Sequence, residues 1–330
     1  MEYKEKLGFR GLEKLITFRS KNTQGIIAID STRKGQALGG LRMYNYNSYK
    51  DALDDAVRLA KAMTQKNDMV DLPYGGGKSV ILSTPNINKK KVLQEFAEIL
   101  NKLKGEYIAV DDVGTSIDDM EYIRKYSKFA RGRYYNGYQI PATSYGVYLI
   151  MKTVAKKRWE DGINNKKVIV EGLGKVGYNL CKLLAKHQCQ LYVYDIDKSK
   201  EQELSSELSV QCIKDFQNVE SDFFSPCAMS GSINSTNIGY LRTSYIIGGA
   251  NNQIIDHKIF PELQKRKILW IPDYLSNSGG VIDIYCEDFD YCEDFVFKEI
   301  EKRIIPKLEW FLTCQAGIIK KWDFPSNCVN

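Results

Sequence analysis

The sequence predicts an α/β protein of two domains, the first a mixed α/β domain and the second a doubly wound parallel sheet. Predicted strands and helices alternate along most of the chain, and after residue 167 they settle into a repeated strand–helix unit. The length of 330 residues suits two domains that each bury a core. With 43% hydrophobic and 27% charged residues, the composition is that of a globular protein and excludes a disordered chain.

The first domain opens with two short strands and a long amphipathic helix. Strands are expected at 25–30 and 39–44, where apolar and β-branched residues follow turn residues. Ser48 is a candidate N-cap of a helix that ends near Lys66, because apolar residues recur along it at helical spacing. A loop that contains Pro73 and three glycines is expected to follow this helix.

The rest of the first domain continues the alternation. A strand at 79–82 precedes a helix over about 88–104 and a strand at 106–110. Ser116 and Asp119 have the spacing of a capping box, which predicts that another helix begins there.

The segment 130–142 is rich in glycine, tyrosine and arginine and has no periodicity, so the domain junction is expected there. The predicted domains are residues 1–135 and 136–299, separated by a cleft, and a helix from Ser144 carries the chain across. A terminal segment, about 300–330, is expected to pack back on the first domain. Strands of the second domain are expected at 168–172, 190–195, 210–213, 222–224, 245–250 and 268–271.

Residue counts exclude several classes of function. Eight cysteines without a C-x-x-C pair exclude a zinc knuckle and a dithiol motif, and predict reduced thiols. With only His187 and His257, neither a metal site nor a histidine triad is expected, so acid–base chemistry falls to lysine, aspartate or tyrosine. The net charge is +6, but the basic residues do not form a block, so nucleic-acid binding is not expected. No signal peptide or membrane span is expected, which favours the cytoplasm.

A glycine motif in the second domain predicts a dinucleotide site of Rossmann type. The strand that ends at Glu171 runs directly into Gly172, Leu173, Gly174, Lys175, Val176 and Gly177, and an apolar-periodic helix follows. In this context Gly172 permits a tight turn, Gly174 lets a pyrophosphate approach the backbone, and Gly177 lets helix and strand pack closely. The phosphates would face the amino end of the helix.

The end of the next predicted strand indicates which dinucleotide is bound. Asp195 follows Gly174 by ~20 residues, where such folds carry the acid that binds the ribose. A carboxylate there accepts hydrogen bonds from both ribose hydroxyls and repels a 2′-phosphate, so NAD is expected rather than NADP. The alternative is three turn glycines and an unrelated aspartate.

Two lysines of the first domain are candidates for catalysis. Lys66 closes the long helix, and Lys78 follows three glycines 12 residues later. A lysine in an apolar, glycine-lined pocket loses hydration, and a second nearby cation lowers its pKa further towards that of a useful base. One lysine could then hold a carboxylate while the other exchanges protons. Taken alone, both could equally be ordinary solvated lysines.

Eight motifs in a fixed order give a more specific signal. They are ALGGLRM (37–43), AMTQKN (62–67), GGGKSVI (75–81), DDVGTS (111–116), TSYGVY (143–148), EGLGKVGYNLC (171–181), GGANNQ (248–253) and PDYLSNSGGVI (272–282). This series, within about residues 20–290, resembles the amino-acid dehydrogenases of the glutamate/leucine/phenylalanine/valine superfamily. Among these enzymes, it is most similar to the leucine dehydrogenases.

The resemblance implies a role for each residue at a motif position. Lys66 would bind the substrate α-carboxylate, Lys78 would be the catalytic lysine, and Asp112 would shuttle the proton of the amino group. Gly39 and Gly40 would line the substrate, Asn277 would bridge substrate and nicotinamide, Thr143 would contact the nicotinamide amide, and Gly249, Ala250 and Asn251 would flank the cofactor.

The reaction so implied is the reversible, NAD-dependent oxidative deamination of an apolar L-amino acid. Hydride would pass from the amino acid Cα to nicotinamide C4 and give an imine. Lys78 would then activate water to attack the imine, and Asp112 would protonate the departing ammonia. The products would be a 2-oxo acid, ammonium and NADH.

Substrate choice is expected to depend on four apolar positions. Matched by motif, the walls of the side-chain pocket would be Leu38, Val110, Val281 and Ile284. These walls favour a branched-chain, leucine-like substrate and disfavour glutamate, although each residue would also suit an ordinary core. Leucine, valine and isoleucine differ by too little in such a pocket to be separated.

Departures from the resemblance leave alternatives open. The pair Pro73-Tyr74 before the glycines is unusual for leucine enzymes and could shift the pocket towards phenylalanine or tryptophan. A catalytically inactive, NAD-binding paralogue is another alternative. The chain ends at Asn330, earlier than leucine dehydrogenases do, which favours a dimer over an octamer as the homo-oligomer. The other expected partners are small molecules, the amino acid and its 2-oxo acid.

Overall fold

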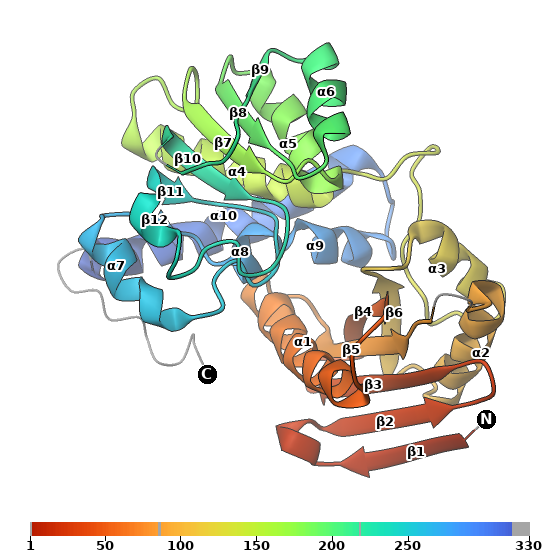
Figure 1. Cartoon of the computed structure of the whole chain (residues 1–330). Helices are drawn as coiled ribbons and strands as arrows, with labels where there is room; N and C mark the ends of the chain where they lie inside the picture. Colours follow the sequence, from red (N-terminus) through yellow and green to blue (C-terminus); the bar gives the residue numbers. More distant parts are fainter. Residues whose placement is uncertain (1, 85–86, 218, 319–330) are drawn as a thin grey trace. The chain divides into compact units, whose positions relative to one another are not determined.

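The computed structural model describes residues 2–84, 87–217 and 219–318, and it divides into two compact units (Figure 1). The first unit comprises Met1–Ile140 and Ile284–Glu293, and the second comprises Pro141–Asp283 and Asp294–Asn330. Each unit is built around a six-stranded sheet with helices. The predicted α/β class with two sheets is confirmed.

The division between the units differs from the predicted boundary after residue 135. The segment that follows β6 stays with the first sheet, since the Arg131 amide donates to the Ala109 carbonyl at 2.8 Å. The terminal residues that lie with the first unit are 284–293, whereas α10 (Glu293–Ile318) lies mainly with the second. There α10 buries Val296, Ile300, Ile304 and Leu308, a stripe at helical spacing. Residues 319–330 of the expected returning segment lie outside the described residues.

The sheet of the first unit is mixed. In spatial order its strands are β1 (Glu2–Leu7), β2 (Lys14–Arg19), β3 (Gln24–Ser31), β5 (Gly75–Leu82), β4 (Ala37–Tyr44) and β6 (Tyr107–Asp111). The first four pair antiparallel, whereas β4 lies parallel to both β5 and β6. Strands β1 and β2 were not predicted. Because β4 lies between β5 and β6, it is the strand over which side chains of its two neighbours can meet.

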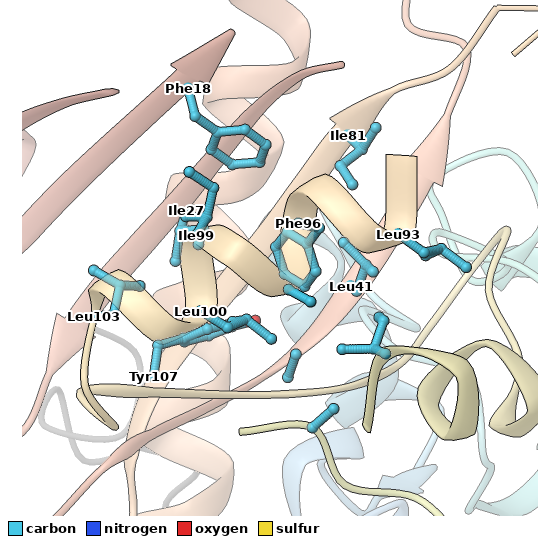
Figure 2. Packing of buried hydrophobic residues seen from close by; sticks show 14 of the residues in the cluster. Phe18, Ile27, Leu41, Ile81, Leu93, Phe96, Ile99, Leu100, Leu103 and Tyr107 are labelled. Atoms are coloured by element: carbon cyan, nitrogen blue, oxygen red, sulfur yellow. The ribbon is translucent and has the colours of Figure 1, made fainter. Parts of the chain in front are cut away.

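Helices cover both faces of this sheet, and the alternation of side chains along β3 explains how. Ile26 packs on α1 (Tyr49–Met69), whereas Ile27 faces α2 (Lys89–Lys102) and α3 (Ile117–Arg124). Figure 2 shows the α2 face, where Phe96, Ile99 and Leu100 lie among strand residues such as Ile27 and Leu41. Burial of each such side chain contributes about 1.5–3 kcal/mol.

The predicted helix starts of the first unit are confirmed by their caps. The Ser48 side chain accepts a hydrogen bond from the Asp51 amide at 3.1 Å and opens α1. Ser116 and Asp119 form the predicted capping box at the start of α3. Both helices are therefore fixed at the end where their free N–H groups need partners.

The three glycines predicted to lie in a loop are instead the first residues of β5, so that prediction is wrong. They are needed because neighbouring backbone comes too close for a side chain. A Cβ on Gly75 would lie 1.7 Å from the Ser31 carbonyl oxygen, and one on Gly76 would lie 2.1 Å from the Thr64 amide of α1. Glycine here permits close packing of the strand against its surroundings rather than a bend.

The sheet of the second unit is parallel throughout. Its spatial order is β12 (Leu269–Trp270), β11 (Arg242–Ile246), β10 (Glu220–Pro226), β7 (Lys167–Glu171), β8 (Gln190–Tyr194) and β9 (Val210–Cys212). The order reverses between β7 and β10, as in the Rossmann arrangement, and ligands of such sheets bind at the carboxyl ends beside that reversal. The remaining helices are α4 (Ala142–Arg158), α5 (Lys175–Ala185), α6 (Lys198–Glu207), α7 (Phe260–Lys265), α8 (Asp273–Ser276) and α9 (Gly279–Cys286).

The close approach at β5 makes a prediction about stability. We expect Gly75→Ala to destabilise the protein by about 1–3 kcal/mol, the usual cost of overpacking, because the added methyl group meets backbone that cannot move freely. Urea denaturation of the variant and the wild type measures the difference. Gly239→Ala is the matched control, since a Cβ on Gly239 meets nothing within 4 Å. Equal stability of all three proteins would contradict this account of β5.

Candidate active site

Lys78 and Asp112 form a buried ion pair in the first unit. Lys78 is on β5 and only 4% exposed, and its Nζ lies 2.7 Å from Oδ2 of Asp112, which directly follows β6. The two strands are separated by β4, where Gly40 lies beneath the pair. A Cβ on Gly40 would lie 2.8 Å from both Lys78 Nζ and Asp112 Cβ. The absence of a side chain at Gly40 therefore lets the lysine and the aspartate meet.

The surroundings of the pair lower the pKa of both groups. Burial lowers the pKa of Lys78 from its ordinary value, against the opposing attraction of Asp112. Burial also disfavours the Asp112 carboxylate, but Lys78 and Arg42 outweigh this and hold the Asp112 pKa at about 2. A lysine with weakened proton affinity beside a fixed carboxylate can take a proton from a substrate or from water and return it.

Arg42 is a further charged member of this cluster that the sequence analysis did not identify. Its Nε donates to Asp112 Oδ2 at 2.8 Å, and its Nη1 donates to Asp55 of α1 at 2.8 Å. The alternation of side chains along a strand is the sequence signal that could have identified Arg42. Because alternate residues of a strand share a face, Arg42 lies on the same face of β4 as Gly40.

Lys66 lies in the last turn of α1 and is half-buried. The adjacent Asn67 is fully buried, and its Nδ2 donates to the Gly75 carbonyl at 2.7 Å. This bond ties the end of α1 to the beginning of β5. The helix end that carries Lys66 is thus fixed beside the strand that carries Lys78.

The other predicted substrate-binding residues are buried within their own units. Gly39 on β4 is pinned by the Tyr107 hydroxyl, which donates to its carbonyl at 2.7 Å. The four predicted pocket walls are apolar and at most 8% exposed; of these, Leu38, Val110 and Ile284 belong to the first unit, and Val281 belongs to the second.

The glycine turn of the second unit has the geometry that its motif predicted. Gly172 has a φ of +90°, which favours glycine, and a Cβ on Gly177 would lie 1.9 Å from the Gly172 carbonyl oxygen. Gly174 is the N-cap of α5, and a Cβ there would meet nothing within 4 Å. The turn therefore presents open backbone at the amino end of a helix, which suits a pyrophosphate.

Asp195, at the carboxyl end of β8, is held rigidly beside this turn. Its Oδ2 accepts a hydrogen bond from the Leu173 amide at 2.7 Å, and its Oδ1 accepts one from the Asp197 amide at 2.8 Å. Lys200 Nζ lies 3.8 Å from Oδ2. Each carboxylate oxygen keeps a lone pair that a ribose hydroxyl can use. These two acceptor oxygens thus fit the hydroxyl groups of an adenosine ribose.

The remaining residues predicted to bind the cofactor gather around the same turn. Ser144 Oγ donates to the Val176 carbonyl at 2.9 Å, which ties Thr143 at the start of α4 to the turn. A Cβ on Gly249 would lie 2.4 Å from the Val176 side chain. Asn277 Nδ2 donates to Asn251 Oδ1 at 2.9 Å and to the Ala250 carbonyl at 3.2 Å, and its buried Oδ1 has no partner among the described residues.

Glu171, immediately before the turn, is an unpredicted feature of this region. Its buried Oε2 has no hydrogen-bond partner in the described part of the chain. Burial raises the pKa of Glu171 to about 7, and Ser232 opposes the shift only in part. The folded unit therefore favours the protonated acid, so ionisation of this group destabilises the fold.

This burial predicts a pH-dependent effect of Glu171→Gln. The amide mimics the protonated acid and cannot ionise, so the variant should gain stability over the wild type as pH rises from about 4.5 to about 7, and the gain should then stay constant. Melting temperatures of both proteins across this range measure the gain. Glu203→Gln changes an exposed carboxylate of α6 and should show no such trend. A gain that is the same at every pH would contradict the prediction.

No group of three or more His, Cys, Asp or Glu residues within 2–84, 87–217 and 219–318 is placed to hold a metal ion. No helix in that part of the chain is both long enough and apolar enough to cross a membrane.

Comparisons with known proteins agree with this arrangement. Residues 16–128 match the family model "Glu/Leu/Phe/Val dehydrogenase, dimerisation domain", and residues 137–197 and 190–303 match "Glutamate/Leucine/Phenylalanine/Valine dehydrogenase". Leucine dehydrogenase of Geobacillus stearothermophilus is 37% identical, over 86% of this chain and 80% of its own. L-tryptophan dehydrogenase of Nostoc punctiforme is 36% identical, over 88% of this chain and 84% of its own.

A solved structure extends the likeness to three dimensions. The crystal structure of L-tryptophan dehydrogenase from Nostoc punctiforme superposes with a TM-score of 0.76 and 35% identity, and the match covers 90% of this chain and 88% of that chain. Matches of this extent and identity show that the chain belongs to the glutamate/leucine/phenylalanine/valine dehydrogenase family and is an amino-acid dehydrogenase, an oxidoreductase that acts on CH–NH₂ donors.

Proposed function

We propose that this enzyme catalyses the reversible, NAD-dependent oxidative deamination of an apolar, leucine-like L-amino acid to its 2-oxo acid and ammonium. The observation that carries the proposal is the buried Lys78–Asp112 pair, held over Gly40 at 2.7 Å. A base and an acid in contact can serve both proton transfers of this reaction without histidine. The fixed end of α1 supplies Lys66 as the cation that holds the substrate carboxylate.

The proposed roles follow from these positions. The chemistry that NAD supplies when bound at the glycine turn is acceptance of a hydride from the substrate Cα. Lys78, with its lowered pKa, takes a proton from the water that attacks the resulting imine. Asp112 receives this proton through its hydrogen bond to Lys78 and passes it to the departing ammonia. The reverse sequence would serve reductive amination.

A leucine-like substrate is supported by the proposed walls. Leu38, Val110 and Ile284 of the first unit, and Val281 of the second, are each buried and apolar, so none of these positions offers an unpaired charge to an aliphatic side chain. Several leucine dehydrogenases match over most of the chain at 35–37% identity, the enzyme of Bacillus cereus at 36% among them.

An aromatic amino acid is the second candidate substrate, and a specific residue favours it. Tyr74 packs edge-on against Tyr285 with ring centroids 6.4 Å apart, and its hydroxyl reaches Asp288 at 3.4 Å. Because Tyr285 follows the proposed wall residue Ile284, Tyr74 can influence the shape of the pocket. The 36% identity to an L-tryptophan dehydrogenase supports this candidate as well.

NAD is proposed over NADP because of Asp195. A 2′-phosphate would bring negative charge against a carboxylate that is 7% exposed and fixed by two backbone amides. Lys200 acts in the opposite sense, since its ammonium group lies 3.8 Å from the carboxylate. We propose that Asp195 dominates, because Lys200 is 42% exposed and its charge is screened by solvent.

We further propose that the enzyme works in the cytoplasm as a homo-oligomer, with a dimer favoured over an octamer. Seven cysteines of the described residues are free thiols, which fits a reducing compartment. The family model that matches residues 16–128 is that of a dimerisation domain, which supports assembly through the first unit.

Activity with each protein amino acid tests the proposed function. With NAD present, we expect NADH absorbance to rise with leucine, valine or isoleucine, whereas a preference for phenylalanine or tryptophan would favour the second candidate. Lys78→Ala should lower kcat by about 10²–10⁴-fold, the usual worth of a general base, while NAD binding at the second unit persists. Lys90→Ala, on an exposed position of α2, should leave kcat unchanged. Wild-type inactivity with every apolar amino acid would contradict the proposal.

The cofactor proposal has its own test at Asp195. Removal of a carboxylate that binds hydroxyl groups should cost about 10–100-fold in NAD affinity, and Asp195→Ala should lose preference for NAD over NADP. Kd values for both dinucleotides, measured by protein fluorescence, give the ratio. Asp215→Ala changes an exposed carboxylate of the same unit and serves as the control. An unchanged ratio in Asp195→Ala would show that another group selects the cofactor.

A further inference from the structure

We propose that Arg42 is a positioning residue that orients Asp112 for proton exchange with the substrate amine, an inference that rests on the function proposed for Lys78 and Asp112. Both cations bind the same carboxylate oxygen, since Arg42 Nε and Lys78 Nζ lie 2.8 and 2.7 Å from Asp112 Oδ2. No hydrogen bond to Oδ1 is present among the described residues. The arrangement fixes one oxygen and leaves the other for the substrate.

The guanidinium is itself anchored by a second carboxylate. Arg42 Nη1 lies 2.8 Å from Asp55 Oδ2 on α1, and the Tyr46 hydroxyl donates to the same oxygen at 2.6 Å. Arg58 binds the other oxygen of Asp55 at 2.5 Å. The Arg42 side chain is only 17% exposed and the Asp55 side chain 14%, so both are held away from most of the solvent. A planar guanidinium can bridge two carboxylates in fixed directions, which a lysine ammonium cannot do.

The cluster is electrically balanced for an internal proton transfer. When Lys78 is protonated, Lys78 and Arg42 offset the charges of Asp112 and Asp55. A proton that moves from Lys78 to Asp112 leaves the total charge of these four groups unchanged. The transfer therefore creates no net charge that would be unfavourable in low-dielectric surroundings. The other titratable groups around the cluster are Tyr46 and Arg58 beside Asp55, and the buried Tyr107 of β6.

This balance gives opposite signs for two substitutions. Arg42→Gln removes a cation near Lys78, so the pKa of Lys78 rises and the acidic limb of the kcat/KM profile should move to higher pH. Asp55→Asn removes a nearby anion, so the same limb should move down. In both variants kcat should fall, about tenfold or more in Arg42→Gln, because Asp112 is held less firmly. KM for the amino acid should change less.

Two more variants separate charge from geometry. Arg42→Lys keeps the positive charge but offers only one point of attachment, so it should restore the position of the acidic limb and only part of kcat. Arg19→Gln is the matched control, because Arg19 is an exposed arginine at the end of β2 in the same unit and does not belong to this cluster. Its pH profile should equal that of the wild type. Melting curves and the Kd for NAD establish that each variant is folded.

The outcomes distinguish this inference from the function on which it rests. If Lys78→Ala stays active, the proposed function fails whatever Arg42 does. If Lys78→Ala is inactive while Arg42→Gln keeps kcat within about twofold and an unshifted profile, the inference about Arg42 is overturned. If Arg42→Gln does not fold, the other two variants decide. The inference is supported if the acidic limb of Asp55→Asn moves to lower pH and if Arg42→Lys keeps the wild-type limb with a reduced kcat. It is refuted if both variants behave as the wild type.

Discussion

The contact between Lys78 and Asp112 is the interaction on which the function proposed for the first unit depends. Its existence requires that a strand between β5 and β6 carry no side chain at Gly40, where any Cβ would collide with both partners. That requirement extends outward through Gly39, Gly75 and Gly76, because the strands and α1 lie too close for larger residues. Close approach of neighbouring atoms therefore sets the residue type at several positions of this sheet.

The two units solve different electrostatic problems with the same means, burial and directed hydrogen bonds. Around Asp112, two cations outweigh burial and keep the carboxylate ionised. Around Glu171, no cation among the described residues offsets the effect of burial, and the pKa of this acid is raised to about 7. Asp195 is a third case, a buried carboxylate fixed by two backbone amides beside a lysine. The pKa of a buried carboxyl group is thus shifted in opposite directions at Asp112 and at Glu171, according to whether cations lie beside it.

Most of the features that could be predicted from the sequence depend on local patterns. The turn at Gly172, the caps at Ser48 and Ser116, and the parallel order of the second sheet depend on residues close together in the chain or on repeated spacing, and all are present. The strand conformation of Gly75 was missed because glycine runs usually mark turns, and only the distant neighbours of β5 reveal the need for close packing.

Long-range partners explain the other omissions. Arg42 and Asp112 are 70 residues apart, and only the order β5-β4-β6 brings Lys78 to the same place. The raised pKa of Glu171 depends on its burial in the folded unit and on the distant Ser232, which no local pattern encodes. β1 lies at an edge and is mostly exposed, so it lacks the apolar run by which buried strands are recognised.

The discontinuity of the first unit has a consequence for biosynthesis. Residues 284–293 complete this unit, since Glu287 accepts a hydrogen bond from the Gly132 amide at 3.0 Å and Asp288 pairs with Arg131 at 2.7 Å. During translation these residues emerge only after the whole parallel sheet has been made. The amino-terminal unit therefore cannot be completed until residues 284–293 have been synthesised. Until then, Tyr74 lacks its aromatic neighbour Tyr285.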